Sequence, residues 1–438
     1  MQLALYHPWV YLYGGAERVI TELLERSRHD WTLYTHHYNP DGTFAPLRPH
    51  VVELGPPVSV RRSLRPLVHA AATMASARLP QNNAQALLVS SEGFGDLLLA
   101  RTNLPTVAYC HTPLKILHDP KARADLAERD PAKASLLRVL GRPFQMVDAA
   151  LWRRYRYVLA NSCETRRRVI DGGLAEPHQV EVLYPGVDTG RFGRGYELLS
   201  AVPAASEREP VFLVAGRIMW QKNITLAIEA FRLAMSRGLR GRLIIAGMVD
   251  QKSEGYLADL RQQAEGLPVT FELCPDDVRL AALYELATAL VFTAPNEDWG
   301  IVPLEAMASG TPVIAVNSGG PRESVVHGET GWLLPGTPRA FASQMHSVTA
   351  MPQELDRMRH ACRLWASRFD WDAFVRRVDD VMEQVVLEGR PAAPTVPTVP
   401  TAPTVPPAPE ATALPPARAA LPAVGVPPPI EQLPSAVA

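Results

Sequence analysis

This sequence has almost no excess of charge of either sign, and it contains little cysteine. The 438 residues contain 44 lysines and arginines and 45 aspartates and glutamates, a formal net charge of −1. A chain without a basic excess has no global electrostatic basis for binding nucleic acid, so we expect no nucleic-acid partner. The four cysteines lie far apart, without the spacing of a metal site or a redox motif, and we expect reduced thiols in a cytosolic protein. They are Cys110, Cys163, Cys274 and Cys362.

Long apolar runs are missing as well. No run approaches the roughly 20 residues that a membrane-spanning helix needs. The N-terminal segment 1–8 has neither the basic region nor the cleavage site of a signal peptide. The sequence therefore predicts a cytoplasmic protein, and any membrane contact would be peripheral, on the inner face of the membrane.

What the sequence does contain is an alternation of short apolar strands and amphipathic helices, which predicts parallel α/β sheets. A chain of this length is expected to form two domains. We expect the strands of the first domain at residues 3–6, 31–35, 86–89, 106–109, 156–160 and 180–183. We expect those of the second domain at residues 211–215, 243–246, 270–273, 289–293 and 313–315.

Changes in composition along the chain predict the domain boundaries. Residues 1–187 are expected to form the first domain, the polar segment 188–209 an interdomain linker, and residues 210–364 the second domain. Residues 365–389 are predicted to form one amphipathic closing helix. Residues 390–438 are rich in proline and alanine and hold 15 of the 41 prolines, so we expect a disordered or polyproline-like tail. A solvated tail is the simpler hypothesis, and a site for a proline-recognising partner is the alternative.

One segment of the second domain carries two acidic residues around the start of a predicted helix. Glu297 lies on the loop after a predicted strand, Gly300 forms a turn, and Glu305 comes about two helical turns later. Both carboxylates can then face a ligand that lies across the helix N-terminus, where the helix dipole favours phosphate. This arrangement suits a nucleotide sugar, because carboxylates accept hydrogen bonds from sugar hydroxyls.

The second domain also opens with a glycine and two basic residues. Gly216 ends a predicted strand, and Arg217 and Lys222 precede a predicted helix. Glycine lets the backbone approach a ligand closely, while an arginine fork and a lysine ammonium can both hold phosphate. Basic residues at a helix start are often merely solvated, but in the same α/β unit as Glu297 and Glu305 they favour a ligand site.

Four motifs resemble, in this order, those of a known family. They are Gly14-Gly15-Ala16-Glu17-Arg18-Val19, Gly216-Arg217 with Lys222, the pair Glu297 and Glu305, and Gly319-Gly320-Pro321-Arg322-Glu323. Residues 1 to about 388 resemble the GT-B-fold retaining glycosyltransferases of family 4, and in particular their mannosyltransferase members. The resemblance implies two Rossmann-like domains that face a cleft, the first on the acceptor side and the second binding a nucleotide sugar. It also implies that the closing helix returns to the first domain.

The resemblance gives a role to each charged residue of the second domain. Arg217 and Lys222, beside Gly216, would bind the donor diphosphate and stabilise the charge that develops on the leaving group. Glu305 would hold the ribose hydroxyls, and Glu297 would hold hydroxyls of the transferred sugar.

Gly14 and Gly15 would let a loop of the first domain close on the phosphates. Enzymes of this family are typically metal-independent, and the nucleotide sugar is their substrate, so we expect neither a cofactor nor a metal. The sequence offers no convincing Asp-x-Asp metal site, which agrees with this expectation.

The first domain carries Tyr109-Cys110-His111-Thr112-Pro113 directly after a predicted strand, at the edge where α/β sheets bind ligands. The segment resembles the Tyr-Cys-His-x-Pro of mannosyltransferase members. A lone histidine is more often structural, but here we place His111 in the active site, touching the donor sugar or the acceptor rather than acting as a nucleophile. Glu92, at the end of another strand, either lines the acceptor site or stabilises its turn.

A second glycine pair follows the last predicted strand. Gly319 and Gly320 offer backbone N–H groups to phosphate or sugar. Glu323 is either part of this site or a carboxylate that a helix dipole favours.

The sequence departs from common family patterns in two places. Asp298-Trp299 stands where a Gly-Phe pair is frequent, and Met219-Trp220-Gln221 replaces smaller or more polar residues before Lys222. We expect the bulky Trp299 to alter the sugar pocket.

Two arginine-rich segments raise the hypothesis of contact with anionic membranes. The segment 152–157 mixes aromatic residues with arginines, and the stretch 58–67 contains Arg61, Arg62 and Arg65. Both could rest on anionic lipid headgroups while a lipid-linked acceptor is presented. The alternative is that each is an ordinary helix with a solvated arginine face.

We therefore predict a hexosyltransferase that acts with retention on a glycan or lipid-linked acceptor in surface polysaccharide or glycolipid synthesis. Retention follows from the resemblance. Because no carboxylate stands out as a covalent nucleophile, a same-face attack, in which the leaving phosphate helps to deprotonate the acceptor, is the preferred hypothesis. GDP-mannose is the preferred donor and a UDP-hexose the runner-up. A sugar-nucleotide epimerase and a non-catalytic scaffold that uses the proline-rich tail are the rival hypotheses.

Overall fold

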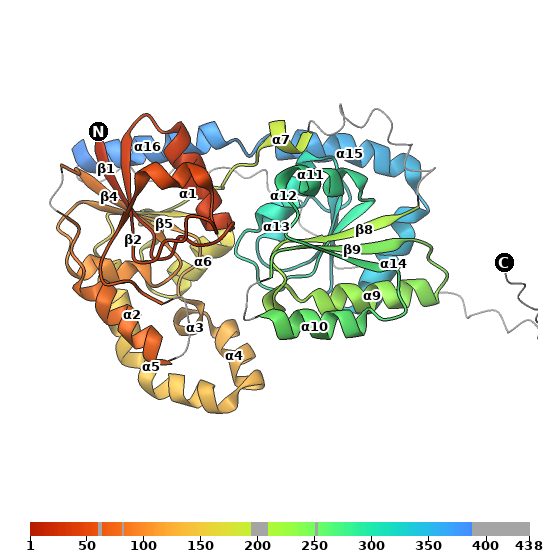
Figure 1. Cartoon of the computed structure of the whole chain (residues 1–438), viewed down its shortest axis with the longest axis horizontal. Coiled ribbons are helices and arrows are strands. Elements are labelled where there is room, and N and C mark those ends of the chain that lie inside the picture. The colour runs from red at the N-terminus through yellow and green to blue at the C-terminus, as the bar shows by residue number, and fades with distance from the viewer. Residues whose placement is uncertain (60–63, 81–82, 194–208, 250–252, 388–438) are drawn as a thin grey trace, which may run out of the picture. The chain divides into compact units, whose positions relative to one another are not determined.

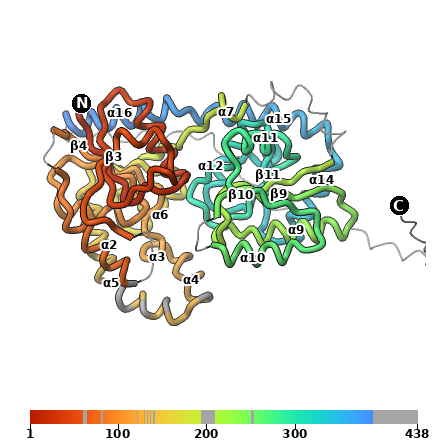
Figure 2. Tube along the Cα trace, viewed as in Figure 1, coloured from red at the N-terminus to blue at the C-terminus, as the bar shows by residue number. Residues whose placement is uncertain are grey.

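The computed structural model describes residues 1–59, 64–80, 83–193, 209–249 and 253–387. These residues form two β-sheets with helices packed around each (Figures 1 and 2). The first sheet has seven strands in the order β3-β2-β1-β4-β5-β6-β7, and the second has six in the order β10-β9-β8-β11-β12-β13. All described strand pairs of both sheets are parallel. The prediction of parallel α/β sheets is therefore confirmed.

The first sheet comprises β1 Gln2–Tyr6, β2 Asp30–Thr35, β3 Val51–Glu53, β4 Ala86–Ser91, β5 Thr106–Cys110, β6 Tyr157–Ala160 and β7 Val180–Val182. The helices between these strands are α1 Gly15–Arg26, α2 Leu64–Ser76, α3 Lys115–His118, α4 Pro120–Arg129, α5 Pro131–Trp152 and α6 Cys163–Asp171. A 3-10 helix, η2 Gly95–Ala100, follows β4. The edge strand β3 and the three helices between β5 and β6 were not predicted from the sequence.

The second sheet comprises β8 Val211–Ala215, β9 Arg242–Gly247, β10 Val269–Leu273, β11 Ala289–Phe292, β12 Val313–Val316 and β13 Gly331–Leu334. Its helices are α7 Thr189–Gly193, α9 Ile224–Ser236, α10 Glu254–Gln263, α11 Asp277–Leu286, α12 Ile301–Ala308, α13 Pro321–Ser324, α14 Pro338–Thr349 and α15 Pro352–Ala366. The last helix is α16 Trp371–Leu387. Only the edge strand β13 is additional to the strands predicted here.

Alternation along β1 assigns its side chains to the two faces of the first sheet. Leu3 and Leu5 lie in a core with residues of α1 and α16. Ala4 and Tyr6 lie in a second core with residues of α2 and α5. Because both faces are covered, the strands are apolar along most of their length, as expected of a buried parallel sheet.

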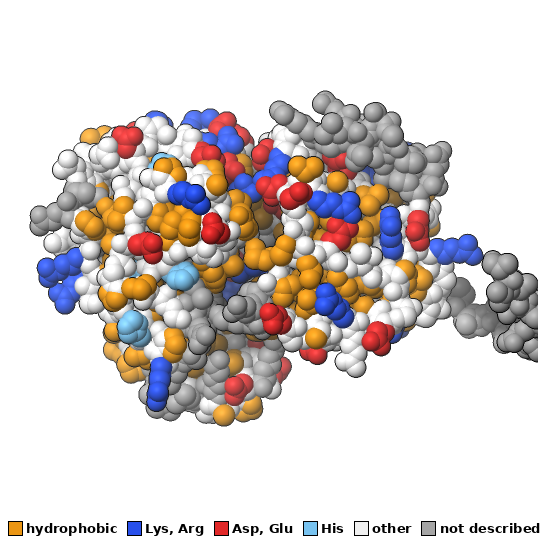
Figure 3. Space-filling model, in the orientation of Figure 1, with side chains coloured by type: hydrophobic (Ala, Val, Ile, Leu, Met, Phe, Trp, Pro, Cys, Tyr) orange, Lys and Arg blue, Asp and Glu red, His pale blue; other side chains and the backbone are white. Residues whose placement is uncertain are grey.

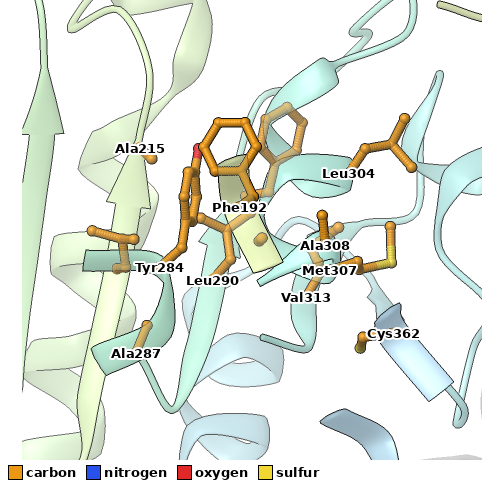
Figure 4. Packing of buried hydrophobic residues seen from close by; sticks show 14 of the residues in the cluster. Phe192, Ala215, Tyr284, Ala287, Leu290, Leu304, Met307, Ala308, Val313 and Cys362 are labelled. Carbon is orange, nitrogen blue, oxygen red and sulfur yellow. The ribbon is translucent and has the colours of Figure 1, made fainter. Parts of the chain in front are cut away.

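The second sheet is also covered on both faces. Phe212 and Val214 pack with α9 and α14, whereas Leu213 packs with α11, α12 and α15. Figure 4 shows part of the latter core, in which Tyr284 of α11 lies edge-on to Phe192 of α7, with ring centroids 5.7 Å apart. The second sheet therefore has its own closed core.

The closing helix predicted over 365–389 is present as α16, but it begins six residues later than expected. Helix α15 ends at Ala366, and α16 begins only at Trp371. The carboxylate of Asp370 caps α16 by accepting hydrogen bonds from backbone N–H groups two and three residues later, at 3.2 and 3.0 Å. The apolar spacing on either side of the break is helical, so this spacing alone did not indicate where α16 begins.

The break serves packing on both sheets. Phe369, inside the break, packs against the second core, and its carbonyl oxygen accepts a hydrogen bond from Val187 N at 2.9 Å. Beyond the break, α16 covers the first sheet. The chain thus passes between the two sheets twice, and the two crossings touch.

Part of the predicted linker belongs to the second core. Residues 189–193 form α7, whose Phe192 side chain is buried there. Residues 194–208 of the linker and the predicted tail at 390–438 lie outside the described residues.

Among the described residues, no helix combines the length and the apolar character that crossing a bilayer requires. On the face visible in Figure 3, acidic and basic side chains are interspersed, in keeping with the formal net charge of −1.

Candidate active site

The loop between β11 and α12 carries the first acidic residue. It ends at Gly300, whose φ of +85° lies in the left-handed region that favours glycine. Oε2 of Glu297 accepts a hydrogen bond from Nζ of Lys222, which follows β8, at 2.7 Å. Burial alone would raise the pKa of Glu297, but Lys222, helped by Lys115 and Arg217, lowers it. Glu297 is therefore an ionised carboxylate that holds the lysine in place.

Gly216 and Arg217 stand at the carboxyl end of β8. Gly216 has a φ of +114°, which again requires glycine. The side chain of Arg217 is exposed, and its charge acts on the carboxyl groups of both Glu297 and Glu17. The two cations and the Glu297 carboxylate were predicted from separate motifs. They lie within electrostatic reach of each other.

Glu305 lies on α12, within the segment that the sequence predicted to be helical. Its Oε2 accepts a hydrogen bond from the Tyr284 hydroxyl at 2.8 Å. Burial raises the pKa of Glu305, while the Tyr284 hydrogen bond and the charges of Arg18 and Arg191 act in the opposite direction. The structure adds these three partners, which no local sequence pattern indicated.

The glycine pair after β12 packs directly against the loop that carries Glu297. Gly320 N donates a hydrogen bond to the carbonyl oxygen of Glu297 at 2.9 Å. A Cβ atom at Gly320 would lie 2.5 Å from Cα of Trp299, so a larger residue cannot fit. The lack of side chains at these glycines therefore lets the Glu297 loop pack against them. Their contact with phosphate or sugar stays a prediction.

The glycine pair before α1 differs between its two members. The space that a Cβ would take at Gly14 is occupied by the carboxyl group of Glu17, whereas Gly15 has open space around the same position. Burial and the charge of Glu92 raise the pKa of Glu17 to about 8, and the charge of Arg217 acts against this shift. Glu17 is thus a buried and largely protonated carboxyl at neutral pH, and its motif predicted no role for it.

His111 follows β5 and is 9% exposed. Its Nε2 lies 2.9 Å from Oγ of Ser90, and its ring is edge-on to Tyr109 and to His7. Burial lowers the pKa of His111 to about 4, against the charge of Glu92. The imidazole is therefore neutral at pH 7, and so is suited to hydrogen bonding rather than to holding a negative charge.

Glu92 is exposed, and its charge acts on His7, His111 and Glu17. Burial lowers the pKa of His7, whose Nδ1 lies 3.1 Å from the Ser90 carbonyl oxygen. The ends of β1, β4 and β5 and the start of α1 thus bring four titratable groups together. His7 was missed because it is a single residue after a strand.

Glu323 contacts a helix other than its own. Its carboxylate accepts hydrogen bonds from the backbone N–H groups of Cys163 and Glu164 at 2.7 and 2.8 Å, and from the Tyr184 hydroxyl at 2.9 Å. Glu323 lies in the first turn of its own helix, as predicted, and its carboxylate also binds the N-terminus of α6.

The expectation that Trp299 shapes the sugar pocket is wrong. The indole is 3% exposed and lies in the second core, with ring centroids 4.5 Å from Tyr184 and 5.5 Å from Phe369. Its neighbour Asp298 points instead toward the first sheet, where it pairs with Lys115 and Arg168.

The arginine-rich segment at 152–157 does not present its aromatic residues to a membrane. Trp152, Tyr155 and Tyr157 are at most 2% exposed and pack inside the first unit, which is the first sheet with the helices that cover it. The second sheet with its helices is the second unit. Arg154 donates to the carbonyl oxygen of Thr102 at 3.1 Å, while Arg153 is exposed. In the other segment, Arg61 and Arg62 lie outside the described residues, and Arg65 is exposed.

In the described part of the chain, no three His, Cys, Asp or Glu side chains gather as a metal site would require. The arrangement consists of a cation pair beside an ionised carboxylate on the second sheet, and a neutral imidazole with a protonated carboxyl on the first. The cations can hold a diphosphate, and the neutral groups can hydrogen-bond to hydroxyls.

Comparison with protein families agrees with this chemistry. Residues 13–191 match the family model of "Glycosyltransferase Family 4", and residues 196–365 match that of "Glycosyl transferases group 1". The D-inositol 3-phosphate glycosyltransferase of Thermobispora bispora is 31% identical over 306 residues, which is 67% of this chain and 68% of that protein. The chain therefore belongs to the family 4 glycosyltransferases and has their GT-B fold.

Two further proteins illustrate the range of these relatives. The alpha-1,3/1,6-mannosyltransferase ALG2 of Homo sapiens is 29% identical over 369 residues, covering 77% of this chain and 85% of that protein. The crystal structure of Anabaena HepE in complex with UDP superposes with a TM-score of 0.66 at 19% identity, covering 87% of this chain and all of that chain. The protein is thus a glycosyltransferase.

Proposed function

We propose that this glycosyltransferase moves mannose from GDP-mannose, with retention of configuration, onto a glycan or lipid-linked acceptor. The observation that carries the proposal is the ion pair of Lys222 with Glu297, 2.7 Å apart, beside Arg217. A donor diphosphate would take over the ammonium of Lys222 and join the guanidinium of Arg217. The carboxylate of Glu297 would then be released to accept hydrogen bonds from the sugar hydroxyls.

The chemical step follows from the same groups. The bond between the anomeric carbon and the diphosphate oxygen breaks, and an acceptor oxygen forms the new bond on the same face. The acceptor proton passes to the departing phosphate, whose charge Arg217 and Lys222 stabilise. Glu305 is proposed to hold the ribose, and the neutral His111 to hydrogen-bond with the donor sugar or the acceptor.

Mannose is supported by two observations. A relative is named as an alpha-1,3/1,6-mannosyltransferase, and the segment Tyr109–Pro113 resembles mannosyltransferase members. A UDP-hexose is the second candidate, because HepE has been solved with UDP and with UDP-glucose. The epimerase and scaffold hypotheses receive no support from the comparisons.

Thermal stabilisation of the purified chain by GDP, UDP and ADP, with EDTA present, tests the donor. A ligand at 100 times its dissociation constant adds about 2.7 kcal/mol to the free energy of unfolding. Selective stabilisation by GDP is expected, and release of GDP from GDP-mannose should follow in an acceptor screen. Selective stabilisation by UDP would replace the donor, and no shift with any nucleotide would contradict the proposed site.

We also propose peripheral contact with anionic membranes, through α5. Met146 and Val147 are 73% and 52% exposed on this helix, between the exposed Arg142 and Arg153. Apolar side chains flanked by arginines suit an anionic interface. Co-sedimentation with phosphatidylglycerol vesicles should be lost in Met146→Asp/Val147→Asp, and absence of binding by the unmodified chain would remove the idea.

A further inference from the structure

The loop that carries Glu297 is held from two directions. On one side the glycine pair at 319 and 320 packs against its backbone, as described above. On the other side it meets three polar side chains from the first unit, on α3 and at the start and middle of α6. They are Lys115, Ser162 and Arg168.

These side chains hold the two residues that flank Glu297. Nζ of Lys115 lies 2.5 Å from Oδ2 of Asp298 and donates to the Asn296 carbonyl oxygen at 3.1 Å. Arg168 pairs with Oδ1 of Asp298 and donates to Oδ1 of Asn296 at 3.1 Å. The first unit thus fixes the backbone immediately before and after Glu297.

The backbone of the loop is held as well. Oγ of Ser162, the N-cap of α6, donates to the Asp298 carbonyl oxygen at 2.6 Å. Asn296 has a φ of +66°, a conformation that a residue other than glycine adopts at a cost. Contacts with the first unit therefore help to maintain an uncommon backbone shape next to Glu297.

The contact between Arg168 and Asp298 is largely buried. The Arg168 side chain is only 2% exposed, and the Asp298 side chain 16%. Arg168 also faces Asp119 at 3.4 Å and Glu164 at 2.9 Å, so it keeps two acidic neighbours when Asp298 is neutralised. Lys115 is 29% exposed, so its replacement leaves no buried charge without a partner.

The elements that present these cations are themselves anchored. His118, one helical turn after Lys115, has Nε2 2.7 Å from Oδ2 of Asp148 on α5, and both side chains are buried. The contact of His118 with Asp148 thus anchors the helix that carries Lys115. This helix follows His111 closely in the sequence.

We propose that Asp298 is a positioning residue. Lys115 and Arg168 of the first unit bind its carboxylate, and Glu297 is oriented for the donor sugar only while these contacts are formed. The inference rests on the proposed function of Glu297. It adds a coupling between the acceptor-side segment at 111–118 and the donor loop. Occupation of the acceptor side and orientation of the donor sugar would thus depend on one another through three side chains.

The test compares Lys115→Met, Asp298→Asn and the double variant with the full-length chain. Arg167→Met is the matched control, because Arg167 is adjacent to Arg168 but its ion pairs among the described residues are with Glu164 and Asp171 of its own helix. Lys115→Met should lower kcat about tenfold or more, because a displaced catalytic loop is costly. Its affinity for GDP or UDP alone should stay within about twofold, since the diphosphate contacts lie elsewhere.

Hydrogen exchange of the peptide around 294–300 gives a readout that needs no turnover. Exchange should be faster in Lys115→Met and Asp298→Asn and unchanged in Arg167→Met, and the double variant should be no worse than the worse single one. Wild-type exchange and kcat in Lys115→Met, or losses that add in the double variant, would overturn the positioning role. If the wild type used no donor, the proposed function would fail. The exchange data would still test whether Lys115 and Arg168 hold the loop through Asp298.

Discussion

The two α/β units differ in the charge state of the polar groups at the carboxyl ends of their strands. In the first unit His111 and Glu17 are buried and neutral at pH 7, because burial lowers the pKa of His111 to about 4 and raises that of Glu17 to about 8, and the charge of the exposed Glu92 acts on both. In the second unit Lys222 lowers the pKa of Glu297, and the two form an ion pair. Neutral groups suit an uncharged, hydroxyl-rich ligand, and charged groups suit a diphosphate. The same fold therefore carries two kinds of chemistry on its two sheets.

Removing charge from the second unit is the strongest test of this difference between the two units. Lys222→Met should lower kcat/KM by about two to three orders of magnitude, as expected when a fixed donor that stabilises developing charge is lost. Initial rates of sugar transfer measure this change, and thermal unfolding establishes that the variant is folded.

Arg279→Met is the matched control in the same unit. Arg279 pairs with Glu272 at the surface, with the arginine side chain 52% exposed, and surface pairs contribute little. Its loss should leave transfer within about twofold. Near-normal turnover in Lys222→Met would refute the assignment of the diphosphate site.

The buried carboxyl of the first unit gives the second test. The pKa of Glu17 is raised in the folded state, so its contribution to stability is present below a pH of about 4.5 and is lost as the pH rises toward 8. Between pH 5 and 7 the free energy of unfolding should fall by up to about 2.7 kcal/mol more in the wild type than in Glu17→Gln.

Urea denaturation at both pH values measures this difference. Glu25 on the same helix is exposed, so Glu25→Gln serves as the control and should follow the wild type. Parallel pH dependence in the wild type and Glu17→Gln would show that Glu17 is ionised in the folded protein.

The smallest expected effect concerns His111. His111→Ala should lower kcat/KM about tenfold, and His111→Gln should restore most of the loss, because an amide replaces one hydrogen bond of a neutral imidazole. The pH profile of kcat should show no step attributable to His111 between pH 5.5 and 7.5. A step near pH 6.5 that disappears in His111→Gln would mean that the histidine works as a cation.

The sequence predicted the central strands of the second sheet well, because β8, β9, β11 and β12 are mostly buried apolar runs. Strand β3 and strand β13 lie at sheet edges and are exposed or only half-buried, so neither is a continuous buried apolar run. The charged residues of the second unit stood out because their motifs are local. The roles of Lys115, Arg168 and Glu323 could not be predicted, because each contacts a residue more than 120 positions away.

The late start of the closing helix has a related origin. Phe369 fits a helical pattern, and its contact with the distant Val187 could not be predicted from the sequence. Asp370, which caps α16, was the local signal of the helix start. Trp299 likewise reads as a pocket residue in the sequence, whereas the rings of Tyr184 and Phe369 enclose it.

The placement of α16 has a consequence for the order in which the protein can be assembled during synthesis. Val378 and Met382 of this helix pack with Leu3 and Leu5 of β1, so one face of the first sheet is incomplete until residue 387 has left the ribosome. Domains generally fold in the order in which they are translated. Here the unit that is translated first can be finished only last, and until then its exposed apolar face is a surface for chaperones to shield.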